Sequence, residues 1–265
     1  MATLAPNSKI KYKWLQKEIN LPKVISRGSK HKIVKPIQEW LCYHGFKTGV
    51  DQDFGPATQK LVKKFQEVSQ LPVTGNVDKA TFQALITPLL EVLTPIADEF
   101  QSFGEAVKAY SIKHLDLHPV EIGGQNMGPW VRLYMQGYEG KDFPWCAGFV
   151  SFVMRQVADF TDFAKPLKGS WSCDSLAAQG REAGIFVSEQ DIQNERISRD
   201  DLDPVSIFLC RRSSTDWTHT GFAINFDEEV FDTIEGNTND EGYREGYEAC
   251  QRVRAYKKKD FLKLV

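Results

Sequence analysis

Several common signals are missing from this chain of 265 residues. Its cysteines number five, an odd count without any Cys-x-x-Cys pair, which argues against a disulfide framework and against a zinc site. No run of residues is apolar enough to span a bilayer, so no membrane span is expected. A glycine-rich stretch at residues 121–128 lacks the Lys-Ser/Thr of a phosphate-binding loop, so we reject nucleotide binding and expect no nucleic-acid partner. The cysteines are Cys42, Cys146, Cys173, Cys210 and Cys250.

The start of the chain also lacks a secretory signal, because it carries closely spaced lysines and no apolar segment. We therefore expect synthesis in the cytoplasm without a signal peptide, whatever the eventual place of work. Residues 1–26 form a basic lead with a short helix expected from Tyr12 to Ile19 and with no function assigned.

Charge is unevenly distributed along a chain that is long enough for two domains. Residues 1–90 contain 14 Lys and Arg against 6 Asp and Glu, whereas residues 91–265 contain 19 against 29. A basic first module attached to an acidic second one indicates a first module that is attracted to a polyanion. The alternative is two solvated surfaces of opposite sign.

Residues 34–85 predict three short helices with apolar residues at 3–4 spacing. Gly45 is placed to end the first helix, Pro56 to start the second, and Asp78 to cap the third. The pattern of residues 53–58 recurs in weaker form at residues 76–81, which indicates a duplicated turn-and-helix unit. Asp51 and Asp53 have the spacing of a calcium loop, but the remaining oxygen ligands are missing, so no metal is expected.

This segment resembles the type 1 peptidoglycan-binding domain over about residues 27–88. The resemblance implies attachment to the cell wall, with peptidoglycan as the partner. Residue by residue, core packing is the alternative explanation of the apolar positions. The matching positions are Ile37-Gln38, Leu41, Gly45-Phe46, Asp51, Phe54-Gly55-Pro56-Ala57-Thr58, Val62, Phe65-Gln66, Leu71-Pro72-Val73-Thr74-Gly75, Thr81-Phe82 and Leu85.

After a linker at residues 89–103, helical patterns come first and strand patterns follow. Helices are expected from about Gly104, from Pro129, from Cys146, and from a cap at Ser172 or Asp174. Alternating apolar residues then predict strands near 205–209, 220–226, 231–234 and 252–256. Helices followed by antiparallel strands indicate an α+β domain at residues 104–265.

Cys146 is the candidate nucleophile of this second domain. It follows Pro144 and Trp145 and opens a helix with apolar residues at positions 149, 150, 153 and 157. In the first turn of a helix, unpaired N–H groups and the positive end of the dipole favour the thiolate and lower the pKa of a cysteine. The alternative is a buried structural cysteine.

His219 is the candidate base, because His31 and His44 fall in the first module while His114 and His118 lie on or beside a helix that looks exposed. On a strand His219 shares its face with two small residues, at positions 221 and 223, which leave room for the cysteine helix to lie there. A surface or core histidine is the alternative.

Glu235 and Asn237 are the candidates for orienting that base. Two apart on the next strand, they are expected to project from one face, where one or both accept the Nδ1–H of the imidazole. The alternative is a turn at the end of a strand.

The order Pro-Trp-Cys-Ala-Gly-Phe-Val, then His-Thr-Gly, then Glu-Gly-Asn-Thr resembles the CHAP family of cysteine, histidine-dependent amidohydrolases/peptidases in the papain-like clan. The resemblance implies Cys146 as nucleophile, His219 as general base and later acid, Glu235 as orienting carboxylate and Asn237 as polar support. The acidic calcium-binding clusters of some relatives are absent upstream of the cysteine, so we expect no metal and no cofactor. Trp145 and Trp217 are candidate walls of the substrate cleft, with core packing as the alternative.

Together the two resemblances predict an enzyme that cleaves amide bonds of peptidoglycan, either as an N-acetylmuramoyl-L-alanine amidase or as an endopeptidase. A non-catalytic wall-binding protein, a Cys-His acyl transferase and a regulatory role inside the cytosol remain alternatives. The place of work is then the wall or periplasm of a host or target bacterium. Both a phage endolysin with a holin partner and a secreted antibacterial effector with an immunity protein fit this reading.

Overall fold

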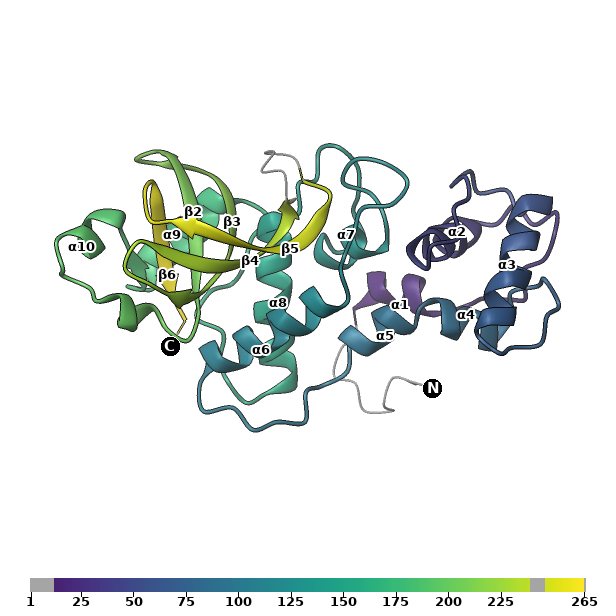
Figure 1. The fold of residues 1–265 in the computed structure, drawn as a ribbon, viewed down its shortest axis with the longest axis horizontal. Coiled ribbons are helices and arrows are strands. Elements are labelled where there is room, and N and C mark those ends of the chain that lie inside the picture. Colours follow the sequence, from purple (N-terminus) through teal and green to yellow (C-terminus); the bar gives the residue numbers. More distant parts are fainter. Residues whose placement is uncertain (1–11, 239–245, 265) are drawn as a thin grey trace. The chain divides into compact units, whose positions relative to one another are not determined.

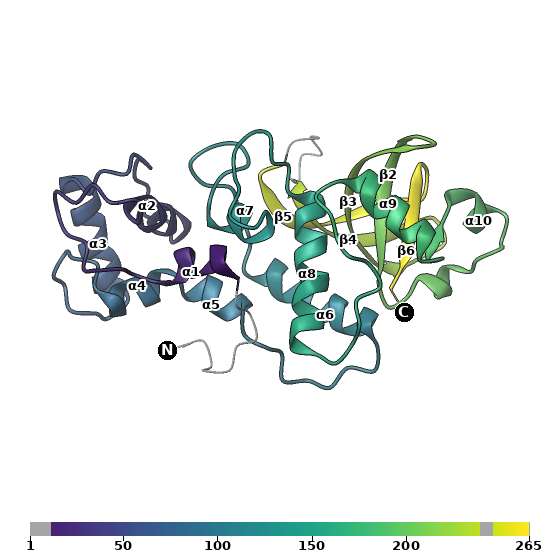
Figure 2. The same cartoon turned by 180° about the vertical axis from the view of Figure 1, so that it is seen from behind.

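The computed structural model describes residues 12–238 and 246–264 and has the mixed α+β class that the sequence predicts (Figures 1 and 2). The chain forms two compact units, Met1–Thr94 with Val120–Lys141, and Pro95–Pro119 with Asp142–Val265. Residues 120–141, which precede Cys146 in the chain, therefore belong to the first unit and not to one continuous domain over 104–265.

Helices make up the first unit, and the predicted boundary residues act as expected. Pro56 is the first residue of its helix, the Asp78 side chain accepts a hydrogen bond from the Thr81 N–H at 2.8 Å, and Gly45 has a φ of +83°. The short helix predicted from Tyr12 to Ile19 is present as well. The helices are α1 (Lys13–Ile19), α2 (Val34–Tyr43), α3 (Pro56–Val68), α4 (Lys79–Leu85), α5 (Thr87–Val92) and α7 (Pro129–Tyr134).

Two glutamines make the same hydrogen bonds in the two copies of the predicted internal repeat. The Gln38 amide on α2 donates to the carbonyl of Asp53 at 3.1 Å and to the Thr58 hydroxyl at 3.2 Å. The second copy makes the same two bonds at 2.8 and 3.0 Å, through Gln66, Asn76 and Thr81. Each glutamine thus fixes the turn that leads into the next helix, because buried backbone groups require such partners.

The second unit contains a six-stranded antiparallel sheet in the order β1-β6-β2-β3-β4-β5. The four predicted strands are β2 (Ser206–Ser213), β3 (Asp216–Phe226), β4 (Val230–Thr238) and β5 (Glu248–Ala255). Two further strands, β1 (Phe186–Val187) and β6 (Lys259–Lys263), were not predicted, because one is only two residues long and the other buries three residues in a row without alternation. The helices are α6 (Phe103–Asp116), α8 (Cys146–Phe160), α9 (Cys173–Glu182), α10 (Glu189–Gln193) and the 3-10 helix η1 (Arg199–Leu202).

The cysteine helix α8 packs on one face of this sheet together with α6, as both views of the ribbon show (Figures 1 and 2). The ring of Phe149 on α8 lies 5.8 Å from that of Phe222 on β3. The neighbouring residue Ala223 faces the other way, into a cluster with Phe208 and Phe231. The expectation that the body of α8 covers the small-residue face of β3 is therefore wrong, because that face is filled by the aromatic cluster.

His114 corrects a second expectation, since it is fully buried between α6 and α8 instead of exposed. Its Nε2 is hydrogen-bonded to Oε1 of Gln156 at 2.9 Å, and its ring stands edge-on to two phenylalanines of α8. Burial lowers the pKa of His114 to about 4, so this histidine is neutral and serves the core. Within the described ranges, no helix combines the length and apolarity that crossing a membrane requires.

Candidate active site

Cys146 is the first residue of α8 and is almost buried, with 6 % of its surface exposed. The N-cap residue Trp145 makes no side-chain cap, and the positive end of the helix dipole lies at the thiol. The backbone N–H of Ala147 also points to the sulfur. These features favour a negative charge on the sulfur, as the sequence predicts.

His219 interacts with this sulfur although the two residues are far apart in the chain, and the interaction lowers the pKa of Cys146 and raises that of His219. On its other side, Nε2 of His219 donates to Oε2 of Glu235 at 2.7 Å. The nitrogen left for the sulfur is therefore Nδ1. The expected ring orientation, with Nδ1–H on the carboxylate, is reversed, because β3 presents the ring with its outer nitrogen towards β4.

Glu235 is completely buried and is held from several directions. Arg254 on β5 binds it through two nitrogens, at 2.5 and 2.6 Å, and the Thr233 hydroxyl donates to it at 2.6 Å. Arg254 was not identified from the sequence. Its only signal is its place in the last predicted strand, and its reach to the carboxylate depends on the pairing of β4 with β5.

Charge in this group is balanced through hydrogen bonds. The contacts from Cys173 and His219 hold the pKa of Cys146 well below its usual value. The sulfur and the Glu235 carboxylate raise the pKa of His219 to about 10, against the opposing effect of burial. Arg254 and His219 keep the pKa of Glu235 below its usual range despite burial. The two shifts go in the directions that favour a thiolate and an imidazolium in this pair.

Cys173 is a second residue of this site that the sequence does not identify. It begins α9, it is 7 % exposed, and its interaction with Cys146 lowers the pKa of the Cys146 thiol. Cys210 lies on β2 directly opposite His219 in the register of the sheet. Without a Cys-x-x-Cys spacing, nothing in the sequence indicates that these thiols meet.

Of the two residues expected to orient the base, Glu235 accepts the hydrogen bond from the imidazole and the Oδ1 of Asn237 does not. The pairing of β4 with β5 shifts between Glu235 and Thr238, and Asn237 adopts a φ of +55° in this irregularity. Among the described residues its buried Oδ1 has no hydrogen-bond partner. The shift interrupts the regular alternation on which the expectation of one shared face for residues 235 and 237 depends.

The two tryptophans proposed as cleft walls are both buried in this structure. Trp145 is 0 % exposed and packs against Gly236, whereas Trp217 is 5 % exposed and donates its indole N–H to Asp260 at 2.8 Å. The alternative of core packing therefore describes them better. In the part of the chain that the structure describes, no group of three or more His, Cys, Asp or Glu side chains is arranged to hold a metal.

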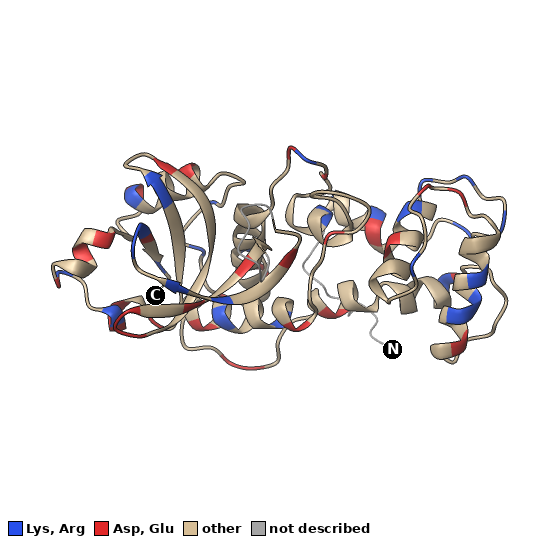
Figure 3. Cartoon of the chain, turned by 45° about the horizontal axis from the view of Figure 1, so that its top comes forward, with Lys and Arg blue, Asp and Glu red and all other residues tan. Residues whose placement is uncertain are grey.

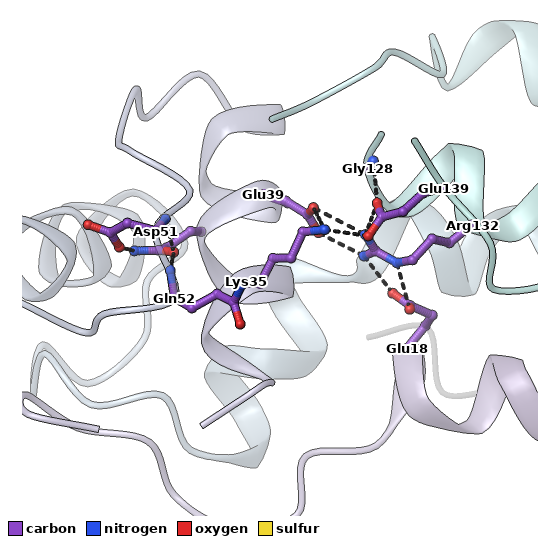
Figure 4. A network of polar contacts seen from close by, with 9 residues as sticks. Glu18, Lys35, Glu39, Asp51, Gln52, Gly128, Arg132 and Glu139 are labelled. Atoms are coloured by element: carbon purple, nitrogen blue, oxygen red, sulfur yellow. Dashed lines mark hydrogen bonds and ion pairs between the residues drawn. The ribbon is translucent and has the colours of Figure 1, made fainter. Parts of the chain in front are cut away.

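The first unit contains a separate cluster of charges around Arg132 on α7 (Figure 4). Its guanidinium bonds Glu18 at 2.8 and 3.0 Å, Glu39 at 3.1 and 2.7 Å, and Glu139 at 2.8 Å. Lys35 pairs with Glu139 from the opposite side. The cluster thus ties α1, α2 and the 120–141 segment together, beside a cavity of about 420 Å³ that the same elements line.

Exposed lysines and arginines occur along much of the first unit, and α3 is one of the helices on which Figure 3 shows them in blue. Its three exposed lysines are Lys60, Lys63 and Lys64. This placement agrees with the basic character of the first module.

Comparison with known proteins identifies the first module independently. Residues 30–85 match the family described as "Putative peptidoglycan binding domain". The match covers α2, α3 and α4 with the turns between them, and it lies within the range 27–88 predicted from the sequence. It supports association with the cell wall and peptidoglycan as a partner. A search of curated proteins found no match to the chain.

Proposed function

We propose that this protein hydrolyses amide bonds of bacterial peptidoglycan by a thiol mechanism of the CHAP type. The observation that carries the proposal is the continuous chain of contacts from the Cys146 sulfur through His219 to the buried Glu235. Nucleophilic catalysis by cysteine needs a base in contact with the sulfur and a third group that orients the base. The peptidoglycan-binding segment supplies the substrate class.

The residues supply the proton transfers in two steps. The Cys146 thiolate attacks the amide carbonyl carbon, and the Nδ1 proton of His219 passes to the leaving amine, which gives a thioester and a free amine. Neutral His219 then takes a proton from a water molecule that attacks the thioester. The acid is released and the thiolate and imidazolium are restored. The backbone N–H of Cys146 is the proposed donor to the oxyanion.

Glu235 and Arg254 act on the ring and not on the substrate. The carboxylate holds the Nε2–H of His219, which keeps Nδ1 directed at the sulfur. Arg254 in turn fixes the carboxylate with two bonds, a geometry that an arginine fork provides and a lysine does not. We therefore assign both as positioning residues.

Digestion of purified peptidoglycan followed by mass spectrometry of the products tests the proposal. We expect new amine and carboxylate ends at one type of amide bond, and their position distinguishes an amidase from an endopeptidase. Cys146→Ala should lower the rate by several orders of magnitude, because the nucleophile acts as a unit with its base. Full lytic activity in this variant would overturn the proposal.

Two further measurements separate the alternatives. Sedimentation with intact walls should show that Cys146→Ala still binds, since the substitution leaves the first unit unchanged. If the parent protein binds walls but releases no fragments, a non-catalytic wall-binding protein is the better description. Added amines that become incorporated in place of water would identify an acyl transferase.

A further inference from the structure

The cavity beside the Arg132 cluster lies in the first unit and contains no residue of the candidate active site. Its volume is about 420 Å³, and pockets that hold small ligands have volumes of about 300–1,000 Å³. Six of its eleven lining residues belong to α1, to the chain just after α1 and to the 120–141 segment, all outside the matched residues 30–85. The cavity is thus built where flanking segments meet the matched module.

One wall of the cavity is a closed network of charges (Figure 4). All five N–H groups of Arg132 donate to carboxylate oxygens, and its side chain is 7 % exposed. Glu139 also accepts from Lys35 and from the Gly128 N–H at 3.0 Å. Because these groups satisfy one another, they hold the shape of the cavity and leave the guanidinium no free donor for a ligand.

Two exposed lysines of the lining are placed differently. Lys17 on α1 and Lys32 just before α2 are open to solvent, and among the described residues neither takes part in an ion pair. The His31 ring, also in the lining, accepts the N–H of Ile33 on Nδ1 at 3.2 Å. In its neutral form this ring therefore carries its proton on Nε2, where it is a donor. The uncommitted groups of the lining suit an anion.

The total charge of the lining has the same sign. It contains four cationic side chains and two carboxylates, and the further carboxylate of Glu39, which Arg132 also binds, still leaves one positive charge. Pro22, Ile33 and Pro36 add apolar surface. A complementary ligand therefore combines a negative charge with a small apolar body.

We propose that this cavity binds the free carboxyl end of a peptide stem of peptidoglycan, with the carboxylate at Lys17 and Lys32 and small apolar side chains against Ile33 and Pro36. Peptide stems of the wall carry this combination, a terminal carboxylate next to the methyl group of an alanine. The proposal rests on the association of the first module with peptidoglycan and not on hydrolysis by the second unit.

Isothermal titration calorimetry of the full chain with N-acetyl-D-alanyl-D-alanine tests the proposal. The Cys146→Ala protein is used, so that the ligand is not cleaved during the titration. The matched ligand is the same dipeptide with a C-terminal amide, which removes the charge and little else. We expect the amide to bind about tenfold more weakly than the acid, because the lysines lose their charged acceptor.

Substitutions at exposed positions locate the site without disturbing the fold. Lys17→Gln together with Lys32→Gln should weaken binding of the acid about tenfold. Lys60→Gln together with Lys64→Gln removes as many exposed charges from α3 and should leave the affinity unchanged.

Equal affinity for the acid and the amide, or equal weakening in the two double variants, would overturn the proposal. Absence of measurable binding would overturn it too. Displacement of the acid by inorganic phosphate at the same concentration would identify a general anion site instead of a site for peptide ends.

This binding does not depend on the chemistry of the second unit. If the acid binds as described and the parent protein digests no wall, the proposed hydrolysis is wrong and the assignment of the cavity stands. If the parent protein digests walls and the acid does not bind, the reverse holds.

Discussion

Replacing Arg132 with methionine should strongly destabilise the first unit. The Arg132 side chain is 7 % exposed, and the carboxylates of Glu18 and Glu39 are 9 % and 0 % exposed. Methionine fills a similar volume but leaves three carboxylates with Lys35 as the remaining cation. Removing one partner of a buried ion pair costs about 3–5 kcal/mol, because the other charge is left buried and uncompensated.

The loss of stability in Arg132→Met, called the deficit below, should also depend on pH. Burial already raises the pKa of Glu39, and loss of Arg132 raises it further. A carboxyl group whose folded pKa lies above its unfolded value binds more protons in the folded state, so its presence lowers stability as pH increases. The deficit of Arg132→Met is therefore largest above neutral pH and shrinks towards pH 4.5, where these carboxyl groups become protonated.

Urea unfolding followed by pulsed hydrogen exchange and mass spectrometry measures this change for each unit separately. At pH 7.5, peptides of α2 and α7 in Arg132→Met should lose their protection from exchange at a urea concentration about 2 M lower than in the parent protein. This shift is a loss of about 4 kcal/mol in the free energy of unfolding divided by a denaturant slope of about 2 kcal/mol per M. Peptides of β2 and β3 in the second unit report whether the effect is local.

Arg196→Met is the matched control, because the Arg196 side chain is 69 % exposed and makes one ion pair at 3.4 Å. Such a surface pair contributes about 0–1 kcal/mol. A deficit below about 1 kcal/mol in Arg132→Met at pH 7.5, or an equal deficit at pH 4.5, would refute the reasoning.

Three other predictions concern the second unit. Glu235→Gln should raise the pH midpoint at which iodoacetamide alkylates Cys146 by about one pH unit, because the imidazolium loses its buried carboxylate. Glu228→Gln, at an exposed position, should leave this midpoint unchanged. Equal midpoints in the two variants would contradict the role assigned to Glu235. Gly236→Ala should cost about 1–3 kcal/mol, since its Cβ meets the buried Trp145 ring at 2.7 and 2.9 Å, whereas a Cβ at Gly49 meets no atom within 4 Å. Equal melting temperatures for these two alanine variants would argue against the close packing. The pKa of His114 falls from 6.5 to about 4 on folding, so the unfolded state binds the extra proton and stability should drop by about 3 kcal/mol between pH 6.5 and 4. His114→Gln should flatten this part of the profile of stability against pH. An unchanged slope would mean that a group other than His114 takes up the proton on unfolding.

The first module could be predicted from the sequence almost completely. Its helices are bounded by residues whose preference is local, such as Pro56 at a helix start and Asp78 as a cap, and these act through neighbours in the chain. The duplicated glutamine contacts extend over 15 or 20 residues and repeat at matching positions, so the pattern is visible as an internal repeat. Local chemistry and short contacts therefore sufficed here.

The second domain shows where such reasoning ends. The place of Cys146 in the first turn of a helix follows from the sequence, because a proline-containing loop and an apolar period fix it. The orientation of the His219 ring does not follow, since it depends on how β3 lies against β4 and α8. Nor does the irregular pairing at Asn237 follow, because the shift between Glu235 and Thr238 has no signal in the neighbouring residues.

The sequence by itself determined the helix starts, the order of elements and the residue types available for chemistry. These depend on backbone preference and periodicity, which act over a few residues. Only the tertiary structure decided that Cys173 meets Cys146, that Arg254 holds Glu235, and that Arg132 gathers three carboxylates. Such contacts join residues up to 114 positions apart, and the free energy that selects them comes from packing and charge pairing in the folded chain.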